Sequence, residues 1–377
     1  MSTIISLVSY PFLPAKLGGQ KGIALFNKYF AKHCRLVCIT TQNNDPAAAD
    51  GYKVVNTISS SPLRYMNIFL FFPIYKAIKK EKATHLILEH PYYGWLGILL
   101  KWASGVKLVV HSHNIESLRW KTLGKWWWPV LALYEKFTHR QADYNFFIRA
   151  EDKTYAIEHF GVKEQKSITV TYGIEWNTIP SAEEKEKCKA GLQETHSFGT
   201  NETVFLFNGS LDYLPNLDAV VTIVEKLNPV LLQSGMQYKI IICGKGLPSN
   251  MNELKEYADK NIIYAGFVDD ITRYFKGADI FVNPVIDGGG IKTKLVEALG
   301  YNMDVVSTVS GAIGVPLTIT GDKMKVFDDN DWNGFAQAMM QPIAKKDIPN
   351  DFFLHFYWEN IAGSAYRFIQ QNSQANN

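Results

Sequence analysis

A glycine-rich run near residue 290 carries the residue types of a phosphate site. It reads Asp287-Gly288-Gly289-Gly290-Ile291-Lys292-Thr293-Lys294-Leu295-Val296-Glu297. Three glycines let backbone N–H groups face a diphosphate, a helix begun near Ile291 adds its positive end, and Lys292 or Lys294 can add charge. Glu297, roughly two helical turns further on, can accept hydrogen bonds from the vicinal hydroxyls of a ribose. The run predicts a nucleotide-diphosphate site; the alternative is a glycine-rich turn ahead of a solvated helix.

A glycine pair, Gly18-Gly19, follows the first apolar run of the chain, Ile4–Val8. Adjacent glycines allow the backbone to approach a ligand closely, and a helix expected from about Gly22 offers its positive end. The spacing does not match the G-x-G-x-x-G dinucleotide fingerprint. The pair therefore indicates either a ligand contact or a simple turn.

Polar residues follow a second apolar run, Leu108–Val110, in the order His111-Ser112-His113-Asn114-Ile115-Glu116. Two histidines at strand spacing project to one side, which is also compatible with a metal hydrolase. That alternative needs further ligands at later strand ends. The remaining candidates fall in helix-like or linker-like stretches, namely His139, His159 and His196. No Asp-x-Asp motif stands in a loop where a nucleotide would need it, so we expect neither a metal nor a cofactor.

The apolar run before these histidines, Leu86–Leu88, ends in Glu89-His90-Pro91-Tyr92-Tyr93-Gly94-Trp95. His90 and Tyr92 offer hydrogen-bonding rings that suit a pocket for an acceptor substrate. Equally, Tyr92 and Trp95 can belong to the hydrophobic core.

These polar residues follow apolar runs that are expected to be strands, so parallel sheets would position them. With 377 residues the chain exceeds the roughly 100 to 200 of one domain, and apolar runs alternate with amphipathic stretches. We expect two doubly wound α/β domains, residues 1–178 and 179–354, in which ligands bind beyond the carboxyl ends of the strands. The expected strands are Ile4–Val8, Arg35–Thr40, Leu86–Leu88, Leu108–Val110 and Tyr144–Ile148 in the first domain, and Val204–Asn208, Lys239–Cys243, Ile262–Ala265, Ile280–Val282 and Asp304–Ser307 in the second.

The four cysteines are scattered, and no basic region or cleavage site marks the start as a signal peptide, so a reducing cytosol is expected. No apolar stretch reaches the length of a membrane span. Charge is uneven: residues 1–178 carry 22 Lys and Arg against 12 Asp and Glu, and the remainder carries 17 against 24. The basic half is expected to face something anionic.

Two segments of the basic half, Arg64–Lys82 and Arg119–Lys136, mix Lys and Arg with Phe and Trp, including Trp126-Trp127-Trp128. This mixture suits a lipid headgroup interface, so peripheral contact with the inner face of a membrane is one interpretation. Buried helices with a solvated basic face are the other. A nucleic acid partner is not expected, because no recognised binding module is present.

Residues 200–315 resemble the C-terminal domain of family 4 retaining glycosyltransferases, which have the GT-B fold. The resemblance rests on the run Asn261–Pro284, on DGGGIKTKLVEAL and on DVVSTVSGAIG. It implies that Phe267 and Val268 border the nucleobase, that Gly288, Gly289, Gly290 and Ile291 meet the diphosphate and sugar, and that Glu297 holds the ribose. A nucleotide-sugar donor and a saccharide or lipid-linked acceptor follow from the same resemblance, as does a role in cell-surface polysaccharide synthesis.

The resemblance extends to the first domain, where His113-Asn114-x-Glu116 is similar to a motif of the acceptor domain of this family and places His113 beside the transferred sugar. Phe356–Ile361 opens a last helix, about 355–377, that resembles the one crossing back to the N-terminal domain in GT-B enzymes. Sugar transfer with retention is the implied reaction, with positioning and charge stabilisation in place of a covalent intermediate.

The sequence also departs from the family in two places. Many members have a glutamate where this chain has Gly289, although a subgroup with a Gly-Gly-Gly loop and Lys-x-Lys is known. Relatives often clamp the diphosphate with an Arg and a Lys where this chain has Ser210 and Asn216. A diphosphate still needs positive charge to bind it, so Lys292, Lys294 or Lys245 is expected to replace the missing Arg and Lys. A nucleotide-sugar-binding protein without catalysis is therefore the second hypothesis.

Overall fold

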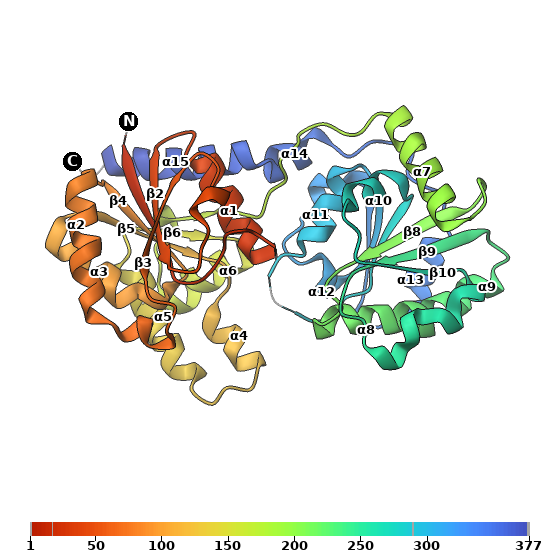
Figure 1. The fold of residues 1–377 in the computed structure, drawn as a ribbon, viewed down its shortest axis with the longest axis horizontal. Helices are drawn as coiled ribbons and strands as arrows, with labels where there is room; N and C mark the ends of the chain where they lie inside the picture. Colours follow the sequence, from red (N-terminus) through yellow and green to blue (C-terminus); the bar gives the residue numbers. More distant parts are fainter. Residues whose placement is uncertain (1, 17, 289, 375–377) are drawn as a thin grey trace. The chain divides into compact units, whose positions relative to one another are not determined.

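The computed structural model describes residues 2–16, 18–288 and 290–374. The chain forms two compact units, Met1–Glu175 with Phe356–Asn377, and Trp176–His355 (Figure 1). Each unit is a parallel sheet with helices packed on it, which confirms the two-domain α/β fold expected from the sequence.

The N-terminal unit is built on a seven-stranded sheet of order β3-β2-β1-β4-β5-β6-β7. Its strands are β1 (Thr3–Val8), β2 (Arg35–Thr41), β3 (Lys53–Ile58), β4 (His85–Glu89), β5 (Lys107–Ser112), β6 (Tyr144–Phe147) and β7 (Ser167–Thr169). All neighbouring strands pair in parallel. Strand order reverses between β1 and β4, and ligands of doubly wound sheets bind beyond the carboxyl ends at such a point.

Helices cover both faces of this sheet. They are α1 (Gly18–Phe30), α2 (Phe71–Glu81), α3 (Gly94–Ser104), α4 (Glu116–Thr122), α5 (Trp128–Gln141), α6 (Ala150–Tyr155) and α15 (Trp358–Gln374). The last helix packs on α1, and its Trp358 is buried against the ring of Tyr172, 5.6 Å between centroids. Trp358 thus anchors the C-terminal helix in the N-terminal unit.

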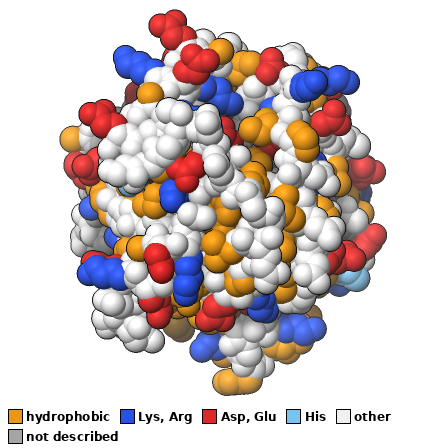
Figure 2. Space-filling model, turned by 90° about the vertical axis from the view of Figure 1, so that its right-hand side faces the viewer, with side chains coloured by type: hydrophobic (Ala, Val, Ile, Leu, Met, Phe, Trp, Pro, Cys, Tyr) orange, Lys and Arg blue, Asp and Glu red, His pale blue; other side chains and the backbone are white. Residues whose placement is uncertain are grey.

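The C-terminal unit has a six-stranded sheet of order β10-β9-β8-β11-β12-β13. Its strands are β8 (Thr203–Asn208), β9 (Tyr238–Cys243), β10 (Ile262–Gly266), β11 (Ile280–Asn283), β12 (Asp304–Thr308) and β13 (Met324–Phe327). Its helices are α7 (Ala182–His196), α8 (Leu214–Thr222), α9 (Asn228–Gln233), α10 (Ile271–Gly277), α11 (Thr293–Gly300), α12 (Val309–Ala312), α13 (Trp332–Met339) and α14 (Asn350–Phe356). Figure 2 views the molecule from the side of α7 and α9, where acidic and basic side chains are interspersed.

One expected helix begins earlier than the sequence indicated. The first helix was expected from about Gly22, yet α1 starts at Gly18, so Gly18 and Gly19 form its first turn. Gln20 fixes the approach of the chain, because its side chain accepts from the Lys16 N–H and donates to the Pro11 carbonyl. Gly18 and Gly19 are both exposed.

Candidate functional site

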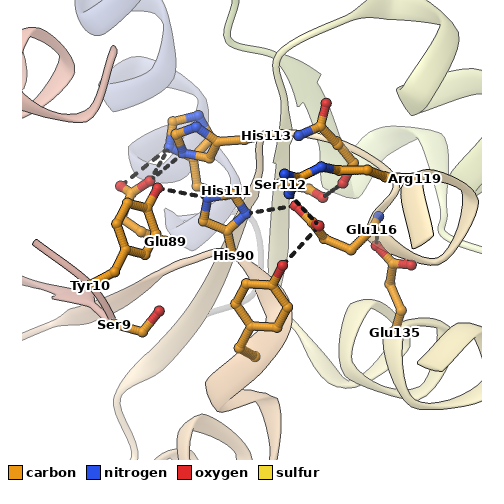
Figure 3. A network of polar contacts seen from close by, with 12 residues as sticks. Ser9, Tyr10, Glu89, His90, His111, Ser112, His113, Glu116, Arg119 and Glu135 are labelled. Atoms are coloured by element: carbon orange, nitrogen blue, oxygen red, sulfur yellow. Dashed lines mark hydrogen bonds and ion pairs between the residues drawn. The ribbon is translucent and has the colours of Figure 1, made fainter. Parts of the chain in front are cut away.

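A network of buried polar side chains lies where β1, β4 and β5 end in the N-terminal unit (Figure 3). Tyr10 lies beyond the end of β1, Glu89 is the last residue of β4 and His90 follows it, and His111 is the last residue but one of β5, with His113 directly after the strand. The parallel register places Glu89 directly opposite His111. The fold therefore gathers at one edge of the sheet groups that come from separate parts of the chain.

Glu89 is the centre of the first half of this network. Its Oε2 lies 3.0 Å from Nδ1 of His111 and 2.7 Å from Nε2 of His113, and its side chain is inaccessible to solvent. Burial by itself raises the pKa of a carboxyl, but the two histidines outweigh burial and hold the pKa of Glu89 well below its usual value. Glu89 is therefore an anion at neutral pH.

His113 is a neutral ring in this setting. Burial lowers its pKa to about 4, and neighbouring His90 acts in the same direction, against the opposing effect of Glu89. The rings of His90 and His113 are stacked, 4.4 Å between centroids. A neutral imidazole can both donate and accept a hydrogen bond, as a contact with sugar hydroxyls requires.

His90 links the first half of the network to the second. Its Nδ1 lies 3.0 Å from Oε1 of Glu116, and its Nε2 lies 2.9 Å from the hydroxyl of Tyr10. The backbone of His90 has φ of 70°, a conformation that is unfavourable for residues other than glycine and that often marks functional sites. In this conformation the His90 ring points toward Glu116 (Figure 3).

Glu116 accepts hydrogen bonds from Tyr92, 2.8 Å away, and from Arg119, 3.4 Å away. Burial raises the pKa of its carboxyl, but His90, Tyr92 and Arg119 together lower that pKa to about 2. The Glu135 carboxylate accepts from the backbone N–H groups of Glu116 and Ser117, at 2.8 and 2.9 Å, and so fixes the start of α4. Burial raises the pKa of Glu135 to about 7.

The structure brings together four of the predicted residues of the N-terminal unit, His90, Tyr92, His113 and Glu116. Asn114 lies beside them, and its carbonyl accepts from the Ser112 hydroxyl. Sequence reasoning missed the roles of the remaining members, which are Tyr10, Glu89, Arg119 and Glu135. For Glu89 a signal was available, because an acidic residue at the end of a buried strand needs a partner.

Glu89, His111 and His113 also have the spacing of a metal site, since each offers a ligand atom and these atoms lie within 4.8 Å of one another. The same three side chains satisfy one another by direct hydrogen bonds. The geometry therefore fits both a hydrogen-bonded cluster and a metal site.

In the C-terminal unit the glycine-rich run joins β11 to α11, as predicted. Gly288 and Gly290 have φ of 94° and 75°, which favour glycine, and a side chain at Gly288 would come within 2.7 Å of the Tyr213 hydroxyl. Gly289 lies outside the described residues. Lys292 immediately precedes α11 and donates to the Gly288 carbonyl, and partly buried Ile291 lies between them. Glu297 follows in the middle of α11, also partly buried.

Lys294, in the first turn of α11, is directed into the unit. Its ammonium lies 3.0 Å from Oδ1 of Asn216 at the start of α8 and 4.1 Å from the centre of the Phe207 ring. Burial, with a smaller effect of Lys292, lowers the pKa of Lys294 to about 7. Among the described residues no carboxylate forms an ion pair with this lysine.

The remaining predicted donor residues lie on neighbouring loops beyond β8, β9 and β10. Ser210 donates to Asp212, and the side chain of Lys245 is exposed while its carbonyl accepts from Leu211. Phe267 is 70% exposed and Val268 is partly buried. Gly18 and Gly19 belong to the other unit.

The class of protein follows from two family models that together cover most of the chain. Residues 18–175 match the model of "Glycosyltransferase Family 4", and residues 202–345 match that of "Glycosyl transferases group 1". The chain belongs to the family 4, group 1 glycosyltransferases.

Curated relatives are distant. An uncharacterised 44.6 kDa protein in the cps region of Klebsiella pneumoniae is 27% identical over 44% of this chain, and the match spans 42% of that relative. An uncharacterised glycosyltransferase of Methanocaldococcus jannaschii is 25% identical over 85% of this chain and 72% of the relative.

Solved structures show the same fold. Sucrose-phosphate synthase from Thermosynechococcus elongatus superposes with a TM-score of 0.69 over 99% of this chain and all of its own, at 14% identity. Anabaena Alr3699/HepE in complex with UDP superposes with a TM-score of 0.71 over 98% of this chain and all of its own, at 14% identity.

Proposed function

We propose that the protein transfers a sugar from a nucleotide-diphosphate donor to a saccharide or lipid-linked acceptor, with retention of configuration, in cell-surface polysaccharide synthesis. The observation that carries the proposal is Lys294, an ammonium group without a carboxylate partner in the described chain, beside a glycine loop. A diphosphate supplies the missing negative charge. The cps-region relative and the UDP complex of the HepE protein support the assignment of process and donor class.

In the proposed reaction the acceptor hydroxyl attacks the anomeric carbon on the face from which the diphosphate leaves. The lysines and the backbone N–H groups of the glycine loop stabilise the charge that develops on the leaving diphosphate. His113 contacts sugar hydroxyls, and His90, Tyr92 and Glu116 bind the acceptor. No side chain forms a covalent bond with the sugar, and we propose that no metal or cofactor takes part.

A thermal-shift panel of UDP, GDP, ADP, CMP and dTDP tests the donor site, because a ligand that binds only the folded state raises the melting temperature. We expect one diphosphate to stabilise the protein and Glu297→Ala to abolish the shift. Product formation from the matching nucleotide sugar, with the anomeric configuration read by NMR, then tests transfer and retention. Binding without any turnover over a panel of acceptors would favour the non-catalytic binding protein.

A metal hydrolase is the rival function, and the spacing of Glu89, His111 and His113 is the observation in its favour. Metal analysis of the purified protein separates the two. Stoichiometric zinc or iron that is lost in His111→Ala, together with no response to any nucleotide, would replace the transferase proposal.

We further propose that the N-terminal unit contacts an anionic membrane surface. No helix in the described chain is long and apolar enough to cross a bilayer. Helices α2, α3 and α5 pack side by side, and α4 packs on α5. Phe69, just before α2, is 71% exposed, and Trp126, between α4 and α5, is 86% exposed. The other exposed apolar side chains there are Leu63, Met66, Ile68, Phe72, Leu99, Trp102, Leu123, Val130, Leu133 and Phe137.

Basic residues lie in the same stretches of sequence as these apolar side chains, which favours anionic lipid over a neutral apolar partner. They include Arg64, Lys76, Lys79, Lys80, Lys101, Lys121, Lys125 and Lys136. Flotation with vesicles of phosphatidylglycerol and phosphatidylcholine tests the contact. We expect binding that needs the anionic lipid, is weakened by salt and is lost in Phe69→Ser/Trp126→Ser. Leu317→Ser, 55% exposed in the other unit, is the matched control and should bind normally.

A further inference from the structure

Glu89 has a role that neither the family motif nor the proposed contacts assign. It is a fully buried carboxylate that touches two histidines, and one of these is His113. An ionised carboxylate only accepts hydrogen bonds, so each ring nitrogen that faces it must carry the proton. For His111 this nitrogen is Nδ1, and for His113 it is Nε2.

A neutral imidazole has only one N–H. His113 donates its single N–H to Glu89 from Nε2, so its Nδ1 is unprotonated and carries a lone pair. In the described part of the chain, His113 makes no hydrogen bond through Nδ1, and this atom is not among the enclosed polar atoms that lack a partner. The ring remains 8% exposed. A small molecule can therefore reach the unprotonated nitrogen.

We infer that Glu89 is a positioning residue that fixes His113 in the Nε2–H tautomer, so that Nδ1 accepts a hydrogen bond from a hydroxyl of a bound sugar. The role of this hydrogen bond in catalysis rests on the proposed sugar transfer, whereas the assignment of the tautomer does not depend on that proposal.

The surroundings of the pair explain why a carboxylate is needed to select the tautomer. His90 stacks on the other side of His113, and its two nitrogens are already directed to Tyr10 and Glu116. Nε2 of His111 is buried without a partner in the described chain. Neither neighbour accepts from His113, so the Glu89 carboxylate is the group that decides which nitrogen holds the proton.

Histidine ¹⁵N NMR spectra test the tautomer directly, with the His113 signals assigned from a His113→Gln variant. We expect protonated Nε2 and bare Nδ1 in the wild-type protein, and a mixture of tautomers in Glu89→Gln, because an amide can donate as well as accept. Protonated Nδ1 in the wild-type protein overturns the inference whether or not the protein transfers sugar. Absence of nucleotide binding and turnover, with Nε2 protonated, would count only against the proposed function.

Kinetics test the catalytic meaning. Loss of a positioned hydrogen-bond partner typically costs about 10² to 10³ in kcat, and we expect a fall of about 100-fold in Glu89→Gln with the donor KM unchanged. His113→Ala should cost a similar factor, and the double variant little more, because the two residues act as one unit. Glu81→Gln, a mostly buried carboxylate paired with Arg35, is the control. Additive losses, or recovery in Glu89→Leu, would contradict the inference.

Discussion

Lys294→Met should stabilise the folded protein and weaken donor binding at the same time. The ammonium of Lys294 is partly buried, contacts Asn216 and the Phe207 ring, and lies near the like charge of Lys292. Methionine keeps most of the volume and the contact with Phe207 while it removes the charge. The two expected effects have opposite signs because the buried charge destabilises the unliganded protein but binds the diphosphate in the complex.

The expected stabilisation follows from the pKa of Lys294, which burial lowers from 10.5 to about 7. Each pH unit of such a displacement corresponds to about 1.36 kcal/mol, and residual solvent contact offsets part of it, so we expect about 2 kcal/mol at pH 7. The folded state binds fewer protons than the unfolded state between pH 7 and 10.5. The gain of the variant is therefore largest at or below pH 7 and disappears toward pH 10.5.

The expected loss of binding is one charge-assisted hydrogen bond, about 1.5 to 3 kcal/mol or roughly 10- to 150-fold in Kd. Wild-type binding should take up a proton near pH 8, because a diphosphate favours the charged lysine. Denaturation curves at several pH values, and calorimetric titration with the nucleotide in buffers of different ionisation enthalpy, measure both effects. Lys255→Met, an exposed lysine, is the control. A variant that is destabilised, or that binds the nucleotide like the wild type, would refute this reasoning.

Three further outcomes are expected. Gly288→Val should abolish nucleotide binding in a thermal-shift assay, because φ of 94° strains a residue with a Cβ and the Tyr213 hydroxyl, 2.7 Å from that Cβ, would have to move. Unchanged binding would mean that the loop does not meet the diphosphate. Glu116→Gln should raise the KM for the acceptor. As the pH falls from about 4.5 to 2, the melting temperature of this variant should fall less than that of the wild type, because the ionised Glu116 carboxylate stabilises the wild-type folded state and is lost over that range. Treatment with EDTA should leave transfer activity unchanged, and a loss restored by added Mg²⁺ or Zn²⁺ would contradict metal independence.

The sequence by itself determined the class of fold and the position of the glycine-rich loop ahead of α11. Buried strands of parallel sheets are short continuous apolar runs, and β1, β4, β5, β8, β9 and β11 were recognisable in this way. The glycine-rich run was recognisable ahead of a helix, and the structure adds that Gly288 and Gly290 have left-handed backbone. The missed strands, β3, β7 and β13, are all edge strands, which have one partner, are partly exposed and carry a weaker apolar pattern.

The tertiary structure alone decided which charged groups meet. The contact of Lys294 with Asn216 joins residues 78 positions apart and depends on how α11 and α8 pack on the sheet. Likewise, Glu89 became part of the site only because the register of β4 and β5 sets it against His111 and His113. Local sequence fixes backbone preference, whereas strand register and packing fix the electrostatic partners on which pKa and function depend.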